Sequence, residues 1–364
     1  MLKFITLASD WKKHNHNNDK SYDTVILHVV KNADCEVFRL DGERIPQLEL
    51  RYPADIEVNY NNFINNKKWI PCADLVKDIP GIFIESWKTA LLTERLAAKT
   101  EHIKELLNEY NQHWEEVFYI NLARSFGFGT NSQAFEMLAK SVPLSVIGKH
   151  KNDLFQLEAL FFGQAGLLQK TENDDYLLRL RKEHEFLKTK YALKPIDGSL
   201  WKLLRLRPDN FPHIRIAQFA AFINTSTKLF SKIIENPDIN YLISLFKSEP
   251  SDYWKTHYLF GEISNDKSKK LGKNSIYSLL INTVIPFVFY YADRNGNEDL
   301  KEKAIVLFEK IPAEKNSIVR GWQNIGIEIN TAYDSQAFLQ LKKCYCDEKK
   351  CLRCRIGHKV LTIK

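Results

Sequence analysis

The sequence contains no apolar run that matches a signal peptide or an uninterrupted membrane span. The N-terminal segment MLKFITLASDW is broken by Asp10 and Trp11 before an apolar core of signal-peptide length can form. The richest apolar run, at residues 275–292, carries Asn282 and Pro286 and falls short of the roughly twenty apolar residues that a spanning helix needs. We therefore expect a buried helix in this region and a cytoplasmic protein with no membrane partner.

Several common catalytic motifs are also absent. The chain has no P-loop, no Gly-x-Ser-x-Gly nucleophile elbow and no His-Glu-x-x-His helix. The GFG segment at residues 127–129 does not match a dinucleotide fingerprint, and we interpret it as a helix C-cap glycine followed by the N-cap of the next helix. No nucleotide-binding or hydrolase family is indicated by a motif.

The cysteines lack the spread of a secreted disulfide framework, because four of the six crowd into residues 344–354. The 364 residues, with 44% hydrophobic and 27% charged side chains, are enough for one large or two ordinary globular domains. The formal net charge of +7 favours an acidic partner, and nucleic acid is the commonest such partner.

Residue patterns predict an α+β protein that is mostly α. Residues 22–50 contain TVILHVV, CEVFRL and RIPQLEL with a turn at Asp41-Gly42, which predicts a short antiparallel β-meander. From Ser86 the apolar period changes to about 3.6 and remains helical to about residue 343. Expected helices cover residues 86–110, 113–125, 131–140, 143–149, 152–167 and 172–191, and another begins near His213. The expected domains are a β-rich part at 1–80, an all-helical domain at 81–340 and a Cys-rich basic tail at 341–364.

The tail CYCDEKKCLRCRIGH predicts a metal knuckle. Thiolates two to four residues apart can converge on one ion, and four soft donors suit tetrahedral zinc or an iron–sulfur cluster. A site closed by four protein ligands would be structural, because no position is left for water. The alternative is a set of reduced, unligated cysteines. The candidate ligands are Cys346, Cys351 and Cys354, with Cys344, His358 and the distant Cys72 competing for the fourth place.

Two basic segments are candidate nucleic-acid contacts. RLRPDNFPHIR places Arg205, Arg207 and Arg215 around a double-proline turn that opens a helix, where free backbone N–H groups and guanidinium groups make an anion site. The alternative is a stiff corner whose arginines pair with carboxylates. The tail adds basic side chains that can bind phosphates or simply form a solvated face: Lys349, Lys350, Arg353 and Arg355.

A polar N-terminal segment, WKKHNHNNDKSYD, offers candidate catalytic residues. A His-x-His pair in extended chain directs both imidazoles to one side, as a metal or a phosphodiester would require. The alternative is a solvated turn, and a third possibility is an enzyme acting on another substrate with His14, His16 and Asp19 as metal ligands. The candidates are Asp10, His14, His16 and Asp19, with His28 on the first expected strand.

Collinear motifs carry a family resemblance over essentially the whole chain. SDWKKHNHNNDKSYDTVILHVV, IPQLEL, ERLAAKTEHI, NFPHIRIAQFA and CDEKKCLRCRIG resemble the bacterial family called domain of unknown function 2851, found mostly in Bacteroidota. Its members typically begin earlier, with a Gly-Pro-Asp-Phe segment and a Glu-x-His strand, an order that looks like the PD-(D/E)XK nuclease core with its Mg²⁺-binding carboxylates. Here Lys3 and Ile5 stand where Glu and His would fall.

The resemblance implies a chain that lacks the family's N-terminal segment. The part at 1–80 would then be the remnant of a nuclease-like domain, and Mg²⁺ or Mn²⁺ would bind only if the missing motif were restored. The function expected is that of a metal-dependent phosphodiesterase acting on nucleic acid, or its impaired truncated form. The alternative is a non-catalytic helical module that binds nucleic acid or protein and carries a structural metal knuckle.

Overall fold

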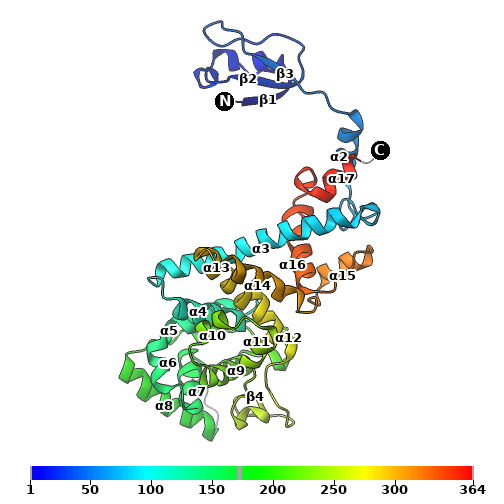
Figure 1. The fold of residues 1–364 in the computed structure, drawn as a ribbon. Helices are drawn as coiled ribbons and strands as arrows, with labels where there is room; N and C mark the ends of the chain where they lie inside the picture. The colour runs from blue at the N-terminus through cyan, green and yellow to red at the C-terminus, as the bar shows by residue number, and fades with distance from the viewer. Residues whose placement is uncertain (1, 170–173, 363–364) are drawn as a thin grey trace. The chain divides into compact units, whose positions relative to one another are not determined.

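The protein is mostly helical, as the sequence predicts. The computed structural model describes residues 2–169 and 174–362, and helices make up 62% of the structure (Figure 1). The chain divides into two compact units, one comprising Met1–Ile79 with Lys349–Lys364 and the other Pro80–Glu348. The cysteine-rich C-terminus from Lys349 onward therefore packs with the N-terminal residues.

The N-terminal sheet is parallel, so the predicted antiparallel meander is wrong. Its strands lie in the order β1 (Leu2–Leu7), β2 (Leu27–Asn32) and β3 (Gln47–Glu49), and both pairings are parallel. His28 of the central strand is in register with Lys3 on one side and Gln47 on the other. Strand β1 was not predicted from the sequence. Because it pairs in parallel with β2, each connection in this sheet is a crossover rather than a tight turn.

The segment CEVFRL does not form a strand, although the turn predicted at Asp41-Gly42 does form. Gly42 has φ +86°, a left-handed value that glycine adopts without strain. The Ile45 amide donates to the Val37 carbonyl at 3.0 Å, and both side chains are buried in a small core with Trp11. This hairpin lies within the connection from β2 to β3. Those two strands are parallel, so they are joined by a longer crossover connection rather than by a tight turn.

Short helices complete the first unit. Helix α17 packs against α2, and a turn through Cys72 precedes the second unit. The helices of this unit are α1 (Asp10–Lys13), η1 (His16–Asn18), η2 (Lys20–Tyr22), α2 (Ala54–Asn65), η3 (Val76–Asp78), η9 (Cys351–Arg353) and α17 (Arg355–Thr362).

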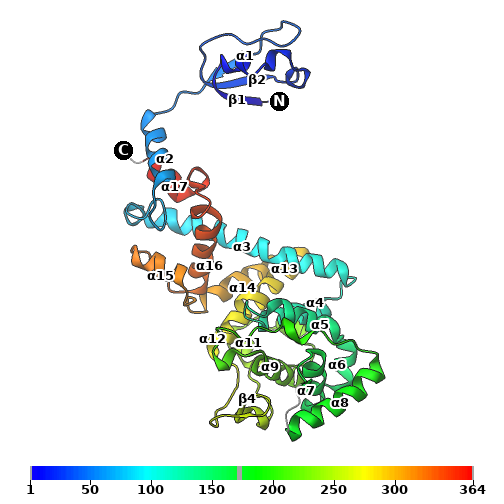
Figure 2. The same ribbon diagram turned by 180° about the vertical axis from the view of Figure 1, so that it is seen from behind.

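The second unit is an assembly of helices around an aromatic core. Figures 1 and 2 show the long helix α3 running beside α13 and α16. The predicted helices are confirmed with shifted ends, and α3 begins earlier than predicted, directly after Pro80. The α-helices are α3 (Gly81–Glu109), α4 (Trp114–Phe126), α5 (Ser132–Ser141), α6 (Leu144–His150), α7 (Leu154–Gln164), α8 (Asp175–Tyr191), α9 (Pro212–Thr225), α10 (Leu229–Glu235), α11 (Ile239–Leu245), α12 (Lys273–Leu279), α13 (Ile285–Arg294), α14 (Glu298–Glu309), α15 (Ser317–Asn324) and α16 (Ala332–Leu341).

This unit also contains two π-helical turns, and the first of them, η7 (Leu280–Val284), joins α12 to α13. The resulting helical segment Lys273–Arg294 is long and apolar enough to span a membrane by length and composition, but 67% of its apolar window is buried inside the protein, as in a core helix. The remaining elements are the π-helices η7 (Leu280–Val284) and η8 (Lys342–Cys346), the 3₁₀-helices η4 (Gly198–Leu200), η5 (Pro208–Asn210) and η6 (Asp252–Lys255), and the hairpin strands β4 (His257–Leu259) and β5 (Glu262–Ile263).

Candidate anion-binding site

The N-terminal histidines gather around one tryptophan. Trp11 is fully buried, and its ring centre lies 5.5 Å from that of His16 and 5.0 Å from that of His28. His14 stacks on His16 at 5.7 Å. Aromatic contacts at these distances stabilise a small core, so the histidine-rich motif has a packing role in the first unit.

The two N-terminal carboxylates named as candidates lie in local turns. Asp10 is the first residue of α1. Asp19 accepts hydrogen bonds from the Ser21 amide at 2.9 Å and the Ser21 hydroxyl at 2.8 Å, and these bonds lower the pKa of its carboxyl. Across residues 2–169 and 174–362, no group of three His, Cys, Asp or Glu side chains is arranged to hold a metal ion.

Three of the candidate cysteines come together in the first unit, although Cys72 and Cys351 are 279 positions apart in the sequence. Cys72, Cys351 and Cys354 are all buried, and burial together with the neighbouring Cys354 and Cys351 raises the pKa of the Cys72 thiol to about 12. The chain packs tightly here, since a Cβ on Gly357 would lie 2.4 Å from the Cys351 carbonyl oxygen. Cys344 and Cys346 belong to η8, and His358 is exposed on α17.

The basic side chains of the tail are exposed. Lys349, which has a left-handed φ of +50°, donates a hydrogen bond to the Ile64 carbonyl oxygen at the end of α2. Lys350, Arg353 and Arg355 are also exposed. These four residues are therefore accessible to a phosphate.

The arginines of the double-proline turn separate into two kinds. Arg205 and Arg207 are exposed in the loop before α9. Arg215 lies one turn inside α9 and is only 7% exposed. Burial therefore distinguishes Arg215 from the other two arginines.

The Arg215 guanidinium is held by neutral partners. It donates to the Gln218 amide oxygen at 2.9 Å, to the Asn210 amide oxygen at 2.5 Å and to the Ser275 hydroxyl at 3.4 Å. Its Nε is buried without a hydrogen-bond partner. Three elements contribute these contacts, namely α9, η5 and α12, so the position of the guanidinium depends on the tertiary fold.

No carboxylate of the described residues forms an ion pair with Arg215, so the predicted alternative of an arginine–carboxylate corner is not found at this position. Asp209, the acid whose charge acts on it, pairs instead with Lys267 at 2.8 Å. Burial lowers the pKa of the Arg215 guanidinium to about 10, which still leaves it charged at neutral pH. A buried cation without an anionic partner is costly, and a bound anion would offset that cost.

Arg215 faces a cavity of about 250 Å³ at the N-terminus of α9. This helix has Pro212 at its start and no side-chain cap at Phe211. Backbone N–H groups of its first turn therefore lack a side-chain partner, and such groups at a helix N-terminus can bind an anion. The lining of the cavity is mixed, and its polar side chains could contact a phosphate or sugar. These side chains are Thr130, Asn131, Asn210, Asn274, Ser275 and Ser278, together with Arg215.

The GFG loop forms one wall of this cavity. Phe128 has a left-handed φ of +43°, and its ring centre lies 4.1 Å from the Arg215 guanidinium carbon. Gly127 is required here, because a Cβ would lie 2.4 Å from the Asn131 backbone. The Asn131 side chain fixes the loop to the segment before α9, because it accepts a hydrogen bond from the Lys202 amide at 2.8 Å and donates one to the Lys202 carbonyl at 3.0 Å.

The sequence indicated only helix caps in this loop, and its place in the lining of a cavity was not predicted. Gly127 and Asn131 do occupy the predicted C-cap and N-cap positions. The Asn131 side chain, however, makes no cap hydrogen bond and instead bonds the Lys202 backbone. A phenylalanine between two closely spaced glycines was the available indication, because such spacing exposes an aromatic ring on a constrained turn.

Comparisons with known proteins yield a family and no function. A family model described as "Protein of unknown function (DUF2851)" matches residues 4–317, which leaves the cysteine-rich segment outside the match. No curated protein and no solved structure shows significant similarity to the chain. The resemblance noted from collinear motifs is thereby confirmed for the family. The match begins at residue 4, and the comparisons show neither a missing N-terminal segment nor a link to nucleases.

Proposed function

Because the chain belongs to the DUF2851 family, whose description names no activity, we propose a function from its own residues, namely that the helical unit binds single-stranded nucleic acid. The observation that carries this proposal is the buried Arg215, which has no carboxylate in contact and lines a cavity with several polar side chains at the start of α9. A guanidinium in such a position suits a phosphate group through charge-assisted hydrogen bonds.

Phe128 favours nucleic acid over a free inorganic anion. Its ring is partly exposed and lines the cavities on both sides of the GFG loop. Single-stranded nucleic acid is commonly held by aromatic stacking of a base beside a cationic contact to the backbone. The pairing of Phe128 with Arg215 provides both contacts at neighbouring positions.

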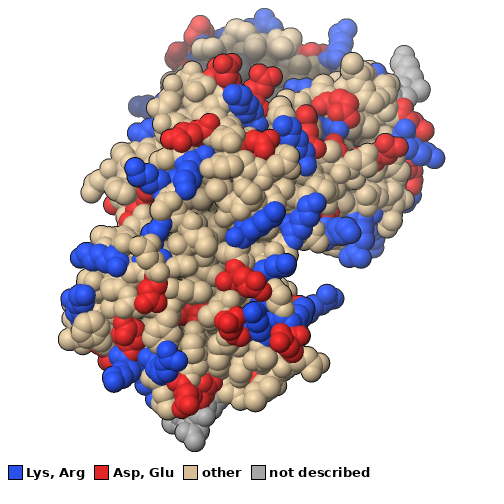
Figure 3. Space-filling model, turned by 60° about the horizontal axis from the view of Figure 1, so that its bottom comes forward, with Lys and Arg blue, Asp and Glu red and all other residues tan. Residues whose placement is uncertain are grey.

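The surface charge supports recognition at a defined site. On the face drawn in Figure 3, Lys and Arg side chains are interspersed with Asp and Glu, and no broad region of one sign covers it. Non-specific binding to duplex DNA depends mainly on many phosphate contacts across a basic surface. The proposed binding instead depends on a few charges in a cavity, which predicts a shallow salt dependence.

The test is a binding titration with a fluorescent single-stranded oligothymidylate at several salt concentrations. We expect Arg215→Gln to weaken binding by at least about tenfold, as for loss of a hydrogen bond to a charged group. Arg207→Gln removes the same charge from an exposed neighbour and is the matched control, expected to change affinity by less than about twofold. Arg215→Lys, with thermal melting of each variant, separates loss of charge from loss of fold.

Equal effects of Arg207→Gln and Arg215→Gln would reduce the proposal to general electrostatics. Absence of binding by the wild-type chain at low salt would remove it altogether.

A structural metal at the cysteine cluster is a second part of the proposal. Cys72, Cys351 and Cys354 are buried neighbours, and the C-x2-C turn of η9 is a common source of two thiolate ligands. Zinc or an iron–sulfur cluster at this position would join the C-terminal segment to the chain before α3. As described, the three thiols are not arranged as a metal site, so binding would require their side chains to turn toward the ion, and a fourth ligand is left to experiment.

Nuclease activity is the remaining proposal from the sequence. It is favoured by the grouping of His14, His16 and His28 near Trp11, and it requires carboxylates that this chain does not carry at the aligned positions. Cleavage of single-stranded DNA with Mg²⁺ or Mn²⁺ should be weak for this chain and should rise with an upstream extension bearing the acidic motif. An inert extended protein would end this proposal.

A further inference from the structure

A second cationic side chain lies on the other side of the GFG loop. Lys99, in the middle of α3, donates hydrogen bonds to the Ile281 carbonyl oxygen at 3.1 Å and to the amide oxygens of Asn282 and Gln336, both at 3.0 Å. All three acceptors are neutral. The carbonyl and amide of residues 281–282 are supplied by the π-helix η7, a distortion that often occurs at functional positions.

Lys99 also has a like-charged neighbour. The Arg95 Nε donates to the same Gln336 oxygen at 2.5 Å, so one amide oxygen serves two cations. Glu314, the acid whose charge acts on both cations, accepts a hydrogen bond from the nitrogen of the Gln336 amide and forms no ion pair with either cation among the described residues. Two partly buried cations that share a neutral partner leave positive charge uncompensated.

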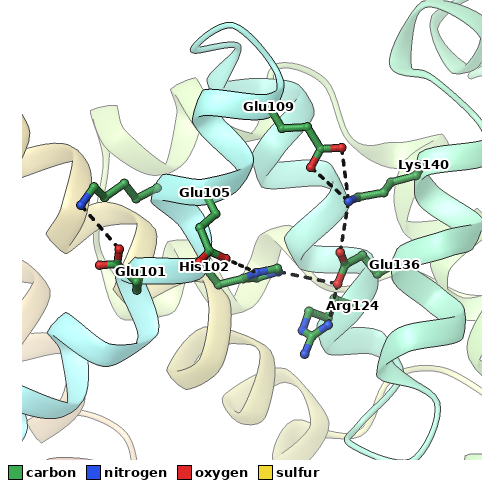
Figure 4. Close-up of polar contacts among 8 residues, drawn as sticks. Glu101, His102, Glu105, Glu109, Arg124, Glu136 and Lys140 are labelled. Atoms are coloured by element: carbon green, nitrogen blue, oxygen red, sulfur yellow. Dashed lines mark hydrogen bonds and ion pairs between the residues drawn. The ribbon is translucent and has the colours of Figure 1, made fainter.

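The neighbouring basic residues differ, because their charge is already balanced. Figure 4 shows Glu136 between Arg124 and His102, with its carboxylate 2.5 Å from the Arg124 guanidinium and 3.6 Å from His102. Lys140 lies 3.3 Å from Glu109 in the same network. Among these groups, Lys99 is the one that has no carboxylate in contact.

Lys99 lines a cavity of about 410 Å³ that adjoins the Arg215 cavity. Phe128 and Ser278 line both cavities, so the GFG loop separates two adjacent spaces. Other polar side chains of the Lys99 cavity are Asn121, Ser125, Ser132 and Asn282. The two cavities thus have the same arrangement. Arg215 in one and Lys99 in the other have no carboxylate in contact and lie among hydroxyl and amide groups beside Phe128.

We propose that Lys99 forms a second phosphate subsite, so that one nucleic-acid strand places one phosphate at Arg215 and another at Lys99, with Phe128 between them. This inference rests on the proposed function and deepens it, because it specifies a ligand with at least two phosphates. An anion beside Lys99 would compensate the Arg95–Lys99 pair.

The electrostatic surroundings agree with this assignment. Burial, and secondarily Arg95, lower the pKa of Lys99 to about 7, while Glu314 acts in the opposite direction. The other charged groups bordering the cavity, Arg124 and His102, are paired with Glu136. Binding of a phosphate would favour the ammonium form, so the second phosphate should bind with uptake of a proton near pH 8.

The test compares thymidine 5′-monophosphate with a 5′-phosphorylated dithymidylate by calorimetry. We expect the two-phosphate ligand to bind at least about tenfold more tightly, the gain of one charge-assisted contact. Lys99→Met should abolish this gain and leave the one-phosphate affinity within about twofold. Titrations in two buffers of different ionisation heat should show proton uptake at pH 8 for the two-phosphate ligand alone.

Lys104→Met is the matched control, because Lys104 lies on the same helix but pairs with Glu101 at the surface. Lys99→Arg keeps the charge and reports whether the fold tolerates a change there. If both ligands bind but Lys99→Met leaves their ratio unchanged, the second subsite is overturned while the Arg215 site stands. If neither ligand nor a longer strand binds, both proposals fall together.

Discussion

The Arg215 guanidinium carbon lies 4.1 Å from the centre of the Phe128 ring, and both residues line a cavity whose lining contains no carboxylate. Residue 128 is on the loop after α4, and residue 215 is in the first turns of α9. A cation over an aromatic face is stabilised by the ring quadrupole, and this effect is larger when the pair is desolvated. The contact therefore both orients the guanidinium and fixes the exposed side of the ring.

Phe128→Ala should weaken binding of single-stranded oligonucleotides by about 5- to 150-fold, the range for loss of one base–aromatic stack. Fluorescence anisotropy with an oligothymidylate measures this change. Phe186→Ala is the matched control, since Phe186 is 60% exposed on α8 and lines none of the cavities described above. Equal affinities for wild type and Phe128→Ala would contradict a stacking role.

The stability contributed by Lys99 should depend on pH in a defined direction. Its pKa falls to about 7 in the folded protein from an ordinary value of 10.5, so between these pH values the unfolded chain binds more protons than the folded one. Stability due to this group therefore rises as pH increases from 7 toward 10. Below pH 7 the charged amine is buried in the folded state and its full cost is present.

Denaturant unfolding of wild type and Lys99→Met at pH 6.5, 8 and 9.5 measures this effect. The advantage of Lys99→Met over wild type should be largest at the lowest of these pH values and should shrink as pH rises. Lys104→Met should show a difference from wild type that does not change with pH over this range. A constant difference for Lys99→Met as well would indicate an ordinary exposed amine.

The cysteine cluster should retain metal through purification. Elemental analysis and an absorbance scan should find about one zinc ion, or the brown colour of an iron–sulfur cluster, per chain. Cys351→Ser should lower the metal content and the thermal midpoint, because a structural metal contributes directly to folding. Cys35→Ser, outside the cluster, should retain the metal. Colourless, zinc-free wild-type protein would contradict the metal proposal.

Gly357→Ala should destabilise the first unit by about 1–3 kcal/mol, as expected for an added methyl group in a closed space. The new Cβ would meet the Cys351 carbonyl oxygen at 2.4 Å, and a backbone atom cannot move aside as a side chain does. Gly148→Ala is the control, since nothing lies within 4 Å of a Cβ there and the residue is helical. That change should be neutral or slightly stabilising, as measured by thermal melting.

The helical body could be predicted from the sequence because its evidence is local. Apolar residues recur at helical spacing from Ser86 onward, and caps such as Asp153 and Asp238 accept hydrogen bonds from the amides of the following turn. The sheet could not be predicted in the same way. Strand residues such as Val30 are buried equally well by parallel and antiparallel partners, and the pairing with β1 depends on contacts distant in sequence.

The candidate site shows the same division. The basic corner at Arg205, Arg207 and Arg215 is visible in the sequence, since proline and arginine spacing is local. Which arginine is buried depends on α12 and the GFG loop, which lie on other parts of the chain. Lys99 falls on the apolar stripe of its helix with Leu96 and Ile103, but this spacing could not show that its amine is enclosed, because a long lysine side chain usually extends from such a stripe to solvent.

The sequence by itself determined the helical class, the positions of most helices, the family and the amino-acid supply of charges and thiols. The tertiary structure alone decided which charges are compensated. Glu136 neutralises Arg124, whereas Arg215 and Lys99 have only neutral partners. The physical reason is that the energy of a buried charge depends on the distance and solvation of groups brought together by folding, and a linear pattern contains neither quantity.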